Sequence, residues 1–141
     1  MIKDFSGQYE FLSNFSPSTV MDYAGIIYPT VEHAYQAAKT LDLQLRKKEF
    51  TTGTAAQAKK KGRQIETRED WEGVKLFIME TLLREKFSIK HPDLVLMLKE
   101  TYPHELVEGN WWGDTYWGVC KGVGQNNLGK LLMKIRQELI K

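Results

Sequence analysis

The sequence has one cysteine, little net charge and no long apolar run, and each shortage excludes a class of protein. Cys120 alone cannot form an internal disulfide, which is typical of a chain that works in a reducing compartment. No segment approaches the roughly 18 apolar residues that a membrane span requires, and residues 1–9 contain no secretory signal pattern. The formal net charge of +2 is too small to bind nucleic acid by bulk electrostatics. We therefore expect a soluble, cytoplasmic protein without a membrane partner.

Metal-ligand and dinucleotide patterns are also missing. His33, His91 and His104 have no zinc-ligand spacing with Cys120 or with one another. Residues 122–129 approach the G-x-G-x-x-G pattern of a phosphate-binding loop, but an asparagine stands where the third glycine belongs. This stretch is either a flexible cap of the last helix or a weak phosphate site at a helix start. We expect neither a metal nor a cofactor.

Length and composition predict one domain over residues 1–141. Apolar residues make up 42% of the chain and charged residues 27%, which are ordinary values for a globular protein. The even spacing of Phe5, Tyr9, Phe11 and Phe15 matches the period of a strand face. We therefore predict extended structure near the start of the chain.

Helix signals dominate after a small hairpin predicted over residues 20–28. Thr30 and Asp42 are predicted N-caps, and Thr54 with Gln57 fits a capping box. No β-α-β alternation occurs, which excludes a Rossmann-type sheet and makes the fold mainly α. We predict about six helices, over residues 31–41, 43–50, 55–61, 70–89, 93–101 and from 128 onward, with Asp70 and Asp93 as caps of the fourth and fifth.

The first chemical candidate is the helix predicted over residues 31–41. Glu32, Gln36 and Lys39 are spaced i, i+4 and i+7, so a carboxylate, an amide and an amine share one stripe. Such a stripe is either a reactive surface or a solvated face with a charge pattern.

The second candidate is the irregular stretch over residues 108–127, which holds Trp111, Trp112 and Trp117 beside glycines. Aromatic faces bind flat bases well, and Asp114 supplies a second carboxylate. The alternative is a loop that its own aromatic rings hold in place.

Together these segments resemble the NADAR (YbiA-like) family of N-glycosidases. The resemblance follows the family's order and covers nearly the whole chain. The matching stretches are residues 12–15, 28–39, 62–63, 68–71, 86–87, 114–118 and 127–129, with Arg136.

The resemblance implies a mainly α, YbiA-like fold and hydrolysis of N-glycosidic bonds. It implies catalytic roles for Glu32, Lys39 and Asp114, and base stacking by Trp71 and Trp117. The residues for which the resemblance implies substrate contacts are Asn14, Gln36, Arg63, Trp71, Trp117, Gly118 and Asn127.

The residue types suit cleavage of a ribosyl C–N bond. Such cleavage passes through an oxocarbenium-like state, in which a carboxylate can stabilise the sugar or activate water while an acid protonates the leaving nitrogen. Lys39 offers a second route, in which its amine attacks C1′ and forms a Schiff base with the opened sugar. The sequence leaves both routes open.

Three functions fit the residues and the resemblance. The first is hydrolysis of small ribosylamino-pyrimidine phosphates, reactive intermediates of riboflavin synthesis, which the modest net charge favours. The second is removal of ADP-ribose from modified guanine in nucleic acid, where basic clusters at residues 46–48 and 59–63 would contact phosphates unless they are solvated surface. The third is a module that binds ADP-ribose or nucleotides without cleaving them. The sequence implies no partner protein.

Overall fold

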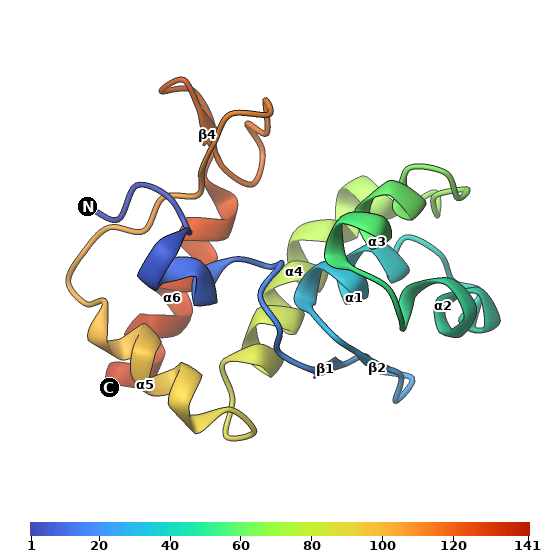
Figure 1. Cartoon of the computed structure of the whole chain (residues 1–141), viewed down its shortest axis with the longest axis horizontal. Helices are drawn as coiled ribbons and strands as arrows, with labels where there is room; N and C mark the ends of the chain where they lie inside the picture. The colour runs from blue at the N-terminus through green and yellow to red at the C-terminus, as the bar shows by residue number, and fades with distance from the viewer. The chain divides into compact units, whose positions relative to one another are not determined.

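The computed structural model describes residues 1–141, and the chain divides into two units. One unit comprises Asn14–Lys86, and the other comprises Met1–Ser13 with Phe87–Lys141. Six α-helices, one 3-10 helix and two sheets of two strands confirm the mainly α prediction (Figure 1). None of the helices is both long and apolar enough to cross a membrane. The single domain expected over the whole chain stays a prediction.

The unit Asn14–Lys86 begins with a small hairpin and continues as four helices. Strands β1 (Val20–Met21) and β2 (Ile27–Tyr28) pair antiparallel, and Gly25 turns between them at a φ of +83°, as the predicted hairpin requires. Helix α1 packs against the other three helices (Figure 1). The four helices are α1 (Val31–Ala37), α2 (Leu43–Phe50), α3 (Ala55–Gly62) and α4 (Trp71–Lys86).

Local caps start three of these helices, as predicted. Thr30 Oγ1 accepts the backbone N–H of His33 at 3.1 Å. Asp42 Oδ1 accepts two backbone N–H groups of α2 at 3.0 and 3.2 Å. Thr54 and Gln57 form both bonds of a capping box at the start of α3. Side chains within one turn of each helix therefore decide where it begins.

Helix α1 ends at Ala37, before the predicted end of the helix over residues 31–41. The carbonyl of Lys39 accepts the backbone N–H of Arg68 at 2.8 Å, and the carbonyl of Thr40 accepts Nε of Arg46 at 2.9 Å. The N–H groups of Lys39 and Thr40 bond only three residues back, to the carbonyls of Gln36 and Ala37 at 3.2 Å, so the α-helix ends in a tighter turn.

The extended start predicted from the aromatic spacing is wrong. Gly7–Leu12 forms a 3-10 helix, η1, and the segment's strand contact is an isolated bridge between Ile2 and Leu106. The evenly spaced rings do not make a buried face, since Leu12 is fully buried whereas Phe15 is 40% exposed. A strand requires a partner along its length, and this segment has one at a single residue.

Helix α4 is shorter at both ends than the predicted helix over residues 70–89. Asp70 does not cap it, because its two carboxylate oxygens accept Nε and Nη2 of Arg68 at 2.6 and 3.0 Å. At the other end Ile89 is 96% exposed, so packing of its side chain does not favour a helix that extends to residue 89.

In the other unit, helix α5 (Pro92–Glu100) packs against helix α6 (Asn127–Ile140). Pro92 occupies the first helical position, where its missing N–H costs nothing, and His91 takes the N-cap position. Asp93 therefore lies in the first turn and is not the cap that the sequence predicted.

Two short parallel strands lie in the stretch predicted to be irregular. Strand β3 (Gly109–Asn110) pairs with strand β4 (Val119–Cys120). Leu98, Leu106 and Leu132 are fully buried and form the apolar centre of this unit.

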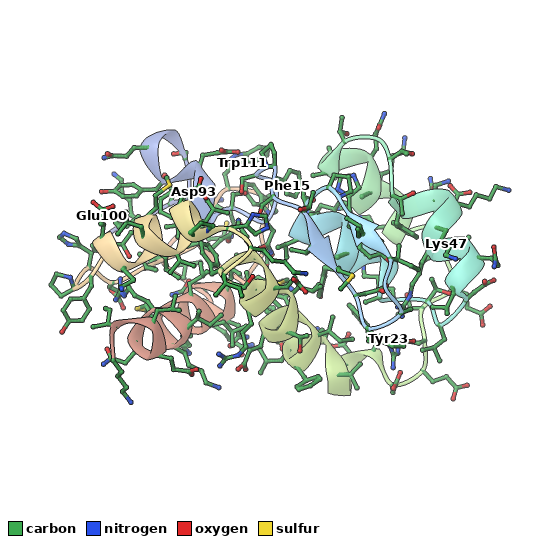
Figure 2. The ribbon with its side chains drawn as sticks, turned by 90° about the horizontal axis from the view of Figure 1, so that it is seen from below. Phe15, Tyr23, Lys47, Asp93, Glu100 and Trp111 are labelled. Atoms are coloured by element: carbon green, nitrogen blue, oxygen red, sulfur yellow. The ribbon has the colours of Figure 1, made fainter.

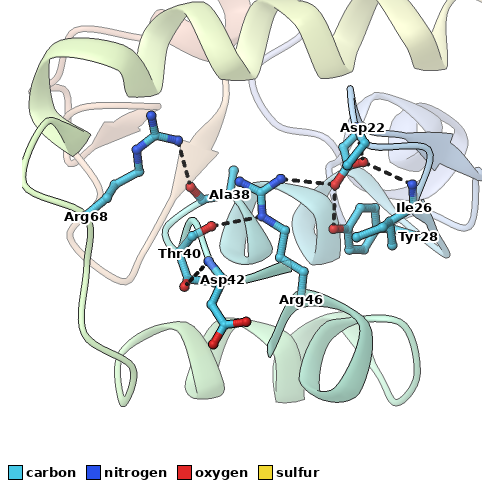
Figure 3. Close-up of polar contacts among 9 residues, drawn as sticks. Asp22, Ile26, Tyr28, Ala38, Thr40, Asp42, Arg46 and Arg68 are labelled. Carbon is cyan, nitrogen blue, oxygen red and sulfur yellow. Dashed lines mark hydrogen bonds and ion pairs between the residues drawn. The ribbon is translucent and has the colours of Figure 1, made fainter. Parts of the chain in front are cut away.

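A buried ion pair joins the hairpin to helix α2, and its arginine also bonds to the segment after α1 (Figure 3). Arg46 is 2% exposed, and its Nη1 lies 3.2 Å from Asp22 Oδ2 while its Nε bonds to Thr40. Asp22 Oδ2 also accepts the hydroxyl of Tyr28 at 2.8 Å. Burial, together with the Asp22 carboxylate, raises the pKa of Tyr28 far above its usual range. Residues 46–48 were predicted either to contact phosphates or to be solvated surface. Arg46 does neither, because it is buried against Asp22.

Arg46→Met should lower the free energy of unfolding by about 3–5 kcal/mol, because it leaves the Asp22 carboxylate buried without its cation. Lys47→Met, at an exposed position of the same helix (labelled in Figure 2), should change it by less than about 0.5 kcal/mol. Urea denaturation measures both values. Equal stability of the two variants would show that the buried pair contributes nothing.

Candidate active site

The polar stripe of α1 is buried, so the alternative of a solvated face is wrong. Glu32 is 7% exposed and Gln36 is 4% exposed. Gln36 Nε2 donates a hydrogen bond to Glu32 Oε2 at 2.6 Å. A carboxylate is costly to remove from water unless polar groups bond to it, and the amide of Gln36 supplies one such bond.

The end of helix α3 holds the Gln36 amide in place. A Cβ at Gly62 would overlap Gln36 Oε1 and Cδ, so only glycine leaves room for the amide there. Since the other end of the same amide bonds to Glu32, the backbone of α3 and the carboxylate lie on opposite sides of Gln36. Packing between α1 and α3 thus orients the carboxylate.

Two buried oxygen atoms near Glu32 have no hydrogen-bond partner. They are Gln36 Oε1 and Asn14 Oδ1, and the second residue is 8% exposed. The carbonyl of Asn14 accepts the backbone N–H of Glu32 at 3.0 Å, which places the two residues side by side. A buried acceptor without a donor costs about 1–3 kcal/mol, and such groups are typical of sites whose ligand supplies the donor.

Lys39 follows α1 and is half-buried between two rings. Its Nζ lies 6.0 Å from the ring centroids of both Tyr35 and Trp71. Burial lowers the pKa of Lys39, the charge of Glu32 opposes that shift, and nearby cations add to it. The amine is therefore neutral more often than that of a lysine in solvent, and a neutral amine is a nucleophile.

The rings beside Lys39 contact each other. Trp71 is 6% exposed and Tyr35 is 7% exposed, with centroids 5.1 Å apart and planes inclined by 55°. Tyr35 was not among the predicted site residues, although its spacing of four residues from Lys39 on the helix predicted over residues 31–41 could have indicated it.

Arg68 joins the end of α1 to the start of α4. Its guanidinium holds both oxygens of Asp70, which lowers the pKa of that carboxyl, and its Nη1 donates to the carbonyl of Ala38 at 3.4 Å (Figure 3). Its backbone N–H bonds to the carbonyl of Lys39. Arg68 thus links the segment that carries Lys39 to the residue before Trp71. The sequence alone did not predict this role for Arg68.

In the other unit Asp114 closes a tight turn. Its Oδ1 accepts the backbone N–H groups of Tyr116 and Trp117 at 3.1 and 2.9 Å. The Asn110 side chain accepts the backbone N–H of Asp114 at 3.0 Å and donates to its carbonyl at 2.8 Å. One oxygen of the predicted second carboxylate thus has a structural role.

Polar side chains, and not the aromatic rings, close this loop. Trp111 is 84% exposed and Trp112 is 48% exposed, in edge contact with each other at 5.5 Å (Trp111 is labelled in Figure 2). Trp117 is half-buried in edge contact with Tyr116 at 4.8 Å. A ring as exposed as that of Trp111 cannot hold the loop in place, so the alternative is wrong for Trp111.

The first two N–H groups of α6 already have partners within the protein. The N–H of Asn127 bonds to the carbonyl of Tyr116 at 3.2 Å, and that of Leu128 bonds to the carbonyl of Trp117 at 3.0 Å. Gly118 lies against the backbone of Glu108, where a Cβ would overlap the carbonyl. Of the two readings of residues 122–129, the cap of the last helix is the one observed.

The unit Asn14–Lys86 therefore gathers most of the predicted site. Glu32, Gln36 and Asn14 are in contact, and Lys39 lies beside Trp71. Arg63 is exposed just after α3, and its charge acts on Lys39. The predicted site residues that belong to the other unit are Asp114, Trp117, Gly118 and Asn127.

Comparisons with known proteins find relatives in both sequence and fold. Residues 2–140 fit the family model described as the NADAR domain. The chain is 37% identical over 137 residues to the N-glycosidase YbiA of Escherichia coli, which covers 95% of this chain and 84% of that protein. It is 36% identical to a riboflavin biosynthesis protein of Vibrio vulnificus over 92% of this chain, but it spans only 35% of that protein. An NMR structure of E. coli YbiA has a TM-score of 0.83 at 35% identity, over 99% of this chain and 87% of that one.

These matches define a class of mainly α proteins that includes named N-glycosidases. This chain belongs to the NADAR domain family.

Gly62→Ala should lower the free energy of unfolding by about 1–3 kcal/mol, because the added methyl group displaces the Gln36 amide. Adding Gln36→Ala should recover part of that loss, which a double-mutant cycle by urea denaturation measures. Gly73→Ala is the matched control: a Cβ there meets nothing within 4 Å, and alanine should stabilise the helix by about 0.5–1 kcal/mol. Additive losses at Gly62 and Gln36 would contradict the contact.

Proposed function

We propose that this chain is an N-glycosidase that hydrolyses the bond between ribose 5-phosphate and a nitrogenous base. The observation that carries the proposal is the buried Glu32–Gln36 pair on the helix that leads to Lys39, an amine whose pKa burial lowers. The proposed substrates are ribosylamino-pyrimidine phosphates. Relatives named N-glycosidases and riboflavin biosynthesis proteins support that substrate class.

Glu32 is the proposed carboxylate that stabilises the sugar. As the C–N bond breaks, positive charge develops on the ribose and negative charge on the leaving base. A carboxylate that is 7% exposed attracts that positive charge more strongly than it would in water. Gln36 holds one carboxylate oxygen and so fixes its orientation before the reaction begins.

Lys39 is the proposed amine of the site, and two routes use it differently. In the first route the amine attacks C1′ as the bond to the base breaks, and the base leaves with a proton. Loss of the nitrogen's proton and opening of the ring then give an imine, which water hydrolyses to ribose 5-phosphate and free lysine. In the second route water attacks C1′ with help from Glu32, and Lys39 only binds the sugar.

The remaining roles extend the family resemblance to this chain. Trp71 is the proposed platform for the base within the unit Asn14–Lys86, and Trp117 is a second stacking ring. Asp114 is the proposed second carboxylate. Substrate contacts are proposed for the other matched residues, Asn14, Arg63, Gly118 and Asn127.

Removal of ADP-ribose from guanine is the second candidate, because cations around Lys39 would also suit a diphosphate. The purified protein is incubated with each substrate class at about 50 and about 200 mM salt, and the released sugar is identified. We expect ribose 5-phosphate from the small substrate with little salt dependence. Release of ADP-ribose from modified DNA, falling steeply with salt, would favour the second candidate.

Glu32→Gln should reduce release of ribose 5-phosphate by at least about 100-fold, because the amide cannot neutralise the developing charge. The amide keeps the shape of the carboxylate, so the thermal midpoint should stay within a few degrees of wild type. Glu66→Gln, at an exposed position, serves as the control and should keep full activity. Full activity in Glu32→Gln would contradict the proposed catalytic role of Glu32.

Borohydride added during turnover should trap a protein–sugar adduct on Lys39, which peptide mass spectrometry locates. The adduct should be absent in Lys39→Ala and present in Lys60→Ala, whose side chain is exposed on α3. If no adduct forms and Lys39→Arg keeps the wild-type rate, the water route is correct and Lys39 is a ligand.

A further inference from the structure

The lysine run at the end of α3 is divided among different environments. Lys61 pairs with Glu49 at 3.4 Å, and Lys60 is exposed. Lys59 is half-buried, with its Nζ 5.9 Å from the ring centroid of Phe15. The three lysines therefore have different surroundings. Only Lys59 of the three lies near Phe15, the residue next to Asn14.

Lys59, Arg63 and Lys75 converge on Lys39 from two helices. Lys59 and Arg63 are four residues apart at the end of α3, so they share one face of it, beside the face on which Gly62 meets Gln36. Lys75 is one turn beyond Trp71 on α4, on the same face as that ring, with its side chain only 14% exposed. The positive charges of all three lower the pKa of Lys39 in addition to its burial.

The positive charges of Lys59, Arg63 and Lys75 all act on Lys39, and repulsion among like charges costs free energy. Glu32 is the acid that opposes the shift in Lys39, and Glu72, the partner of Lys75 at 2.6 Å, is 82% exposed. A dianion bound among these cations would remove the repulsion and convert it into affinity. The partnerless oxygens of Gln36 and Asn14 are acceptors and suit hydroxyl groups of a sugar attached to that anion.

We propose that Lys59 and Lys75, together with Arg63, form the subsite that binds the phosphate of ribose 5-phosphate. This inference rests on the proposed function, since it assigns one part of the substrate to one part of the same site. Cations from α3 and α4 hold the phosphate, and the sugar lies toward Glu32 and Gln36. Discrimination between phosphorylated and unphosphorylated ribosides therefore comes from these two helices.

Calorimetric titration with ribose 5-phosphate tests the subsite without any turnover. Lys59→Gln and Lys75→Gln should each weaken binding of ribose 5-phosphate about tenfold, and the double variant about a hundredfold. Inorganic phosphate should follow the same order, whereas the weak binding of ribose should not change. Lys60→Gln is the matched control on α3 and should bind like wild type. Lys59→Arg should recover most of the affinity, and thermal midpoints should confirm that all variants fold.

The outcomes separate the subsite from the activity. Unchanged ribose 5-phosphate affinity in the double variant overturns the subsite, even if the wild type cleaves N-glycosides. Loss of affinity for ADP-ribose alone overturns it in favour of a diphosphate site. If affinity falls as expected while the wild type releases no sugar from any riboside, the subsite holds and the proposed hydrolysis fails.

Discussion

Helix α1 is buried along its whole length, and the unit Asn14–Lys86 is organised around that constraint. Three polar side chains of the helix must then find partners within the protein. His33 bonds to Thr30 at 2.8 Å and to the carbonyl of Gly53 at 3.0 Å, which attaches the helix to the loop before α3. Glu32 and Gln36 bond to each other and leave one amide oxygen without a partner. The same burial that stabilises the helix thus encloses the Glu32 carboxylate, for which a catalytic role is proposed.

Two arginines that need not touch a substrate fix the end of this helix. Arg46 takes the carbonyl of Thr40 and Arg68 takes that of Ala38, on either side of Lys39 (Figure 3). Each arginine is held in turn by a carboxylate, Asp22 or Asp70. The amine therefore projects from a short segment whose backbone is bonded at both sides, which limits the entropy lost when a ligand binds.

Buried acceptors without donors and cations gathered at one place both cost stability. Asn14, Gln36 and the lysines around Lys39 combine these two costs within one unit of the chain. Binding sites commonly retain such strain, because a ligand that supplies the missing donors and the opposite charge recovers the free energy on binding. The location of these buried acceptors and cations thus indicates a binding site without reference to similar proteins.

The sequence by itself determined the features that depend on neighbours a few residues away. The caps at Thr30, Asp42 and Thr54, the turn of the hairpin and the stripe on α1 all follow from local hydrogen bonds and helical spacing. Which polar residues are buried depends on the tertiary structure. Arg46 and Lys59 each stand in a basic run of the sequence. Arg46 nevertheless pairs with the distant Asp22, whereas Lys59 lies near Phe15. Tertiary structure also decided where helices end and which segments find a strand partner, because those outcomes depend on bonds between residues far apart along the chain.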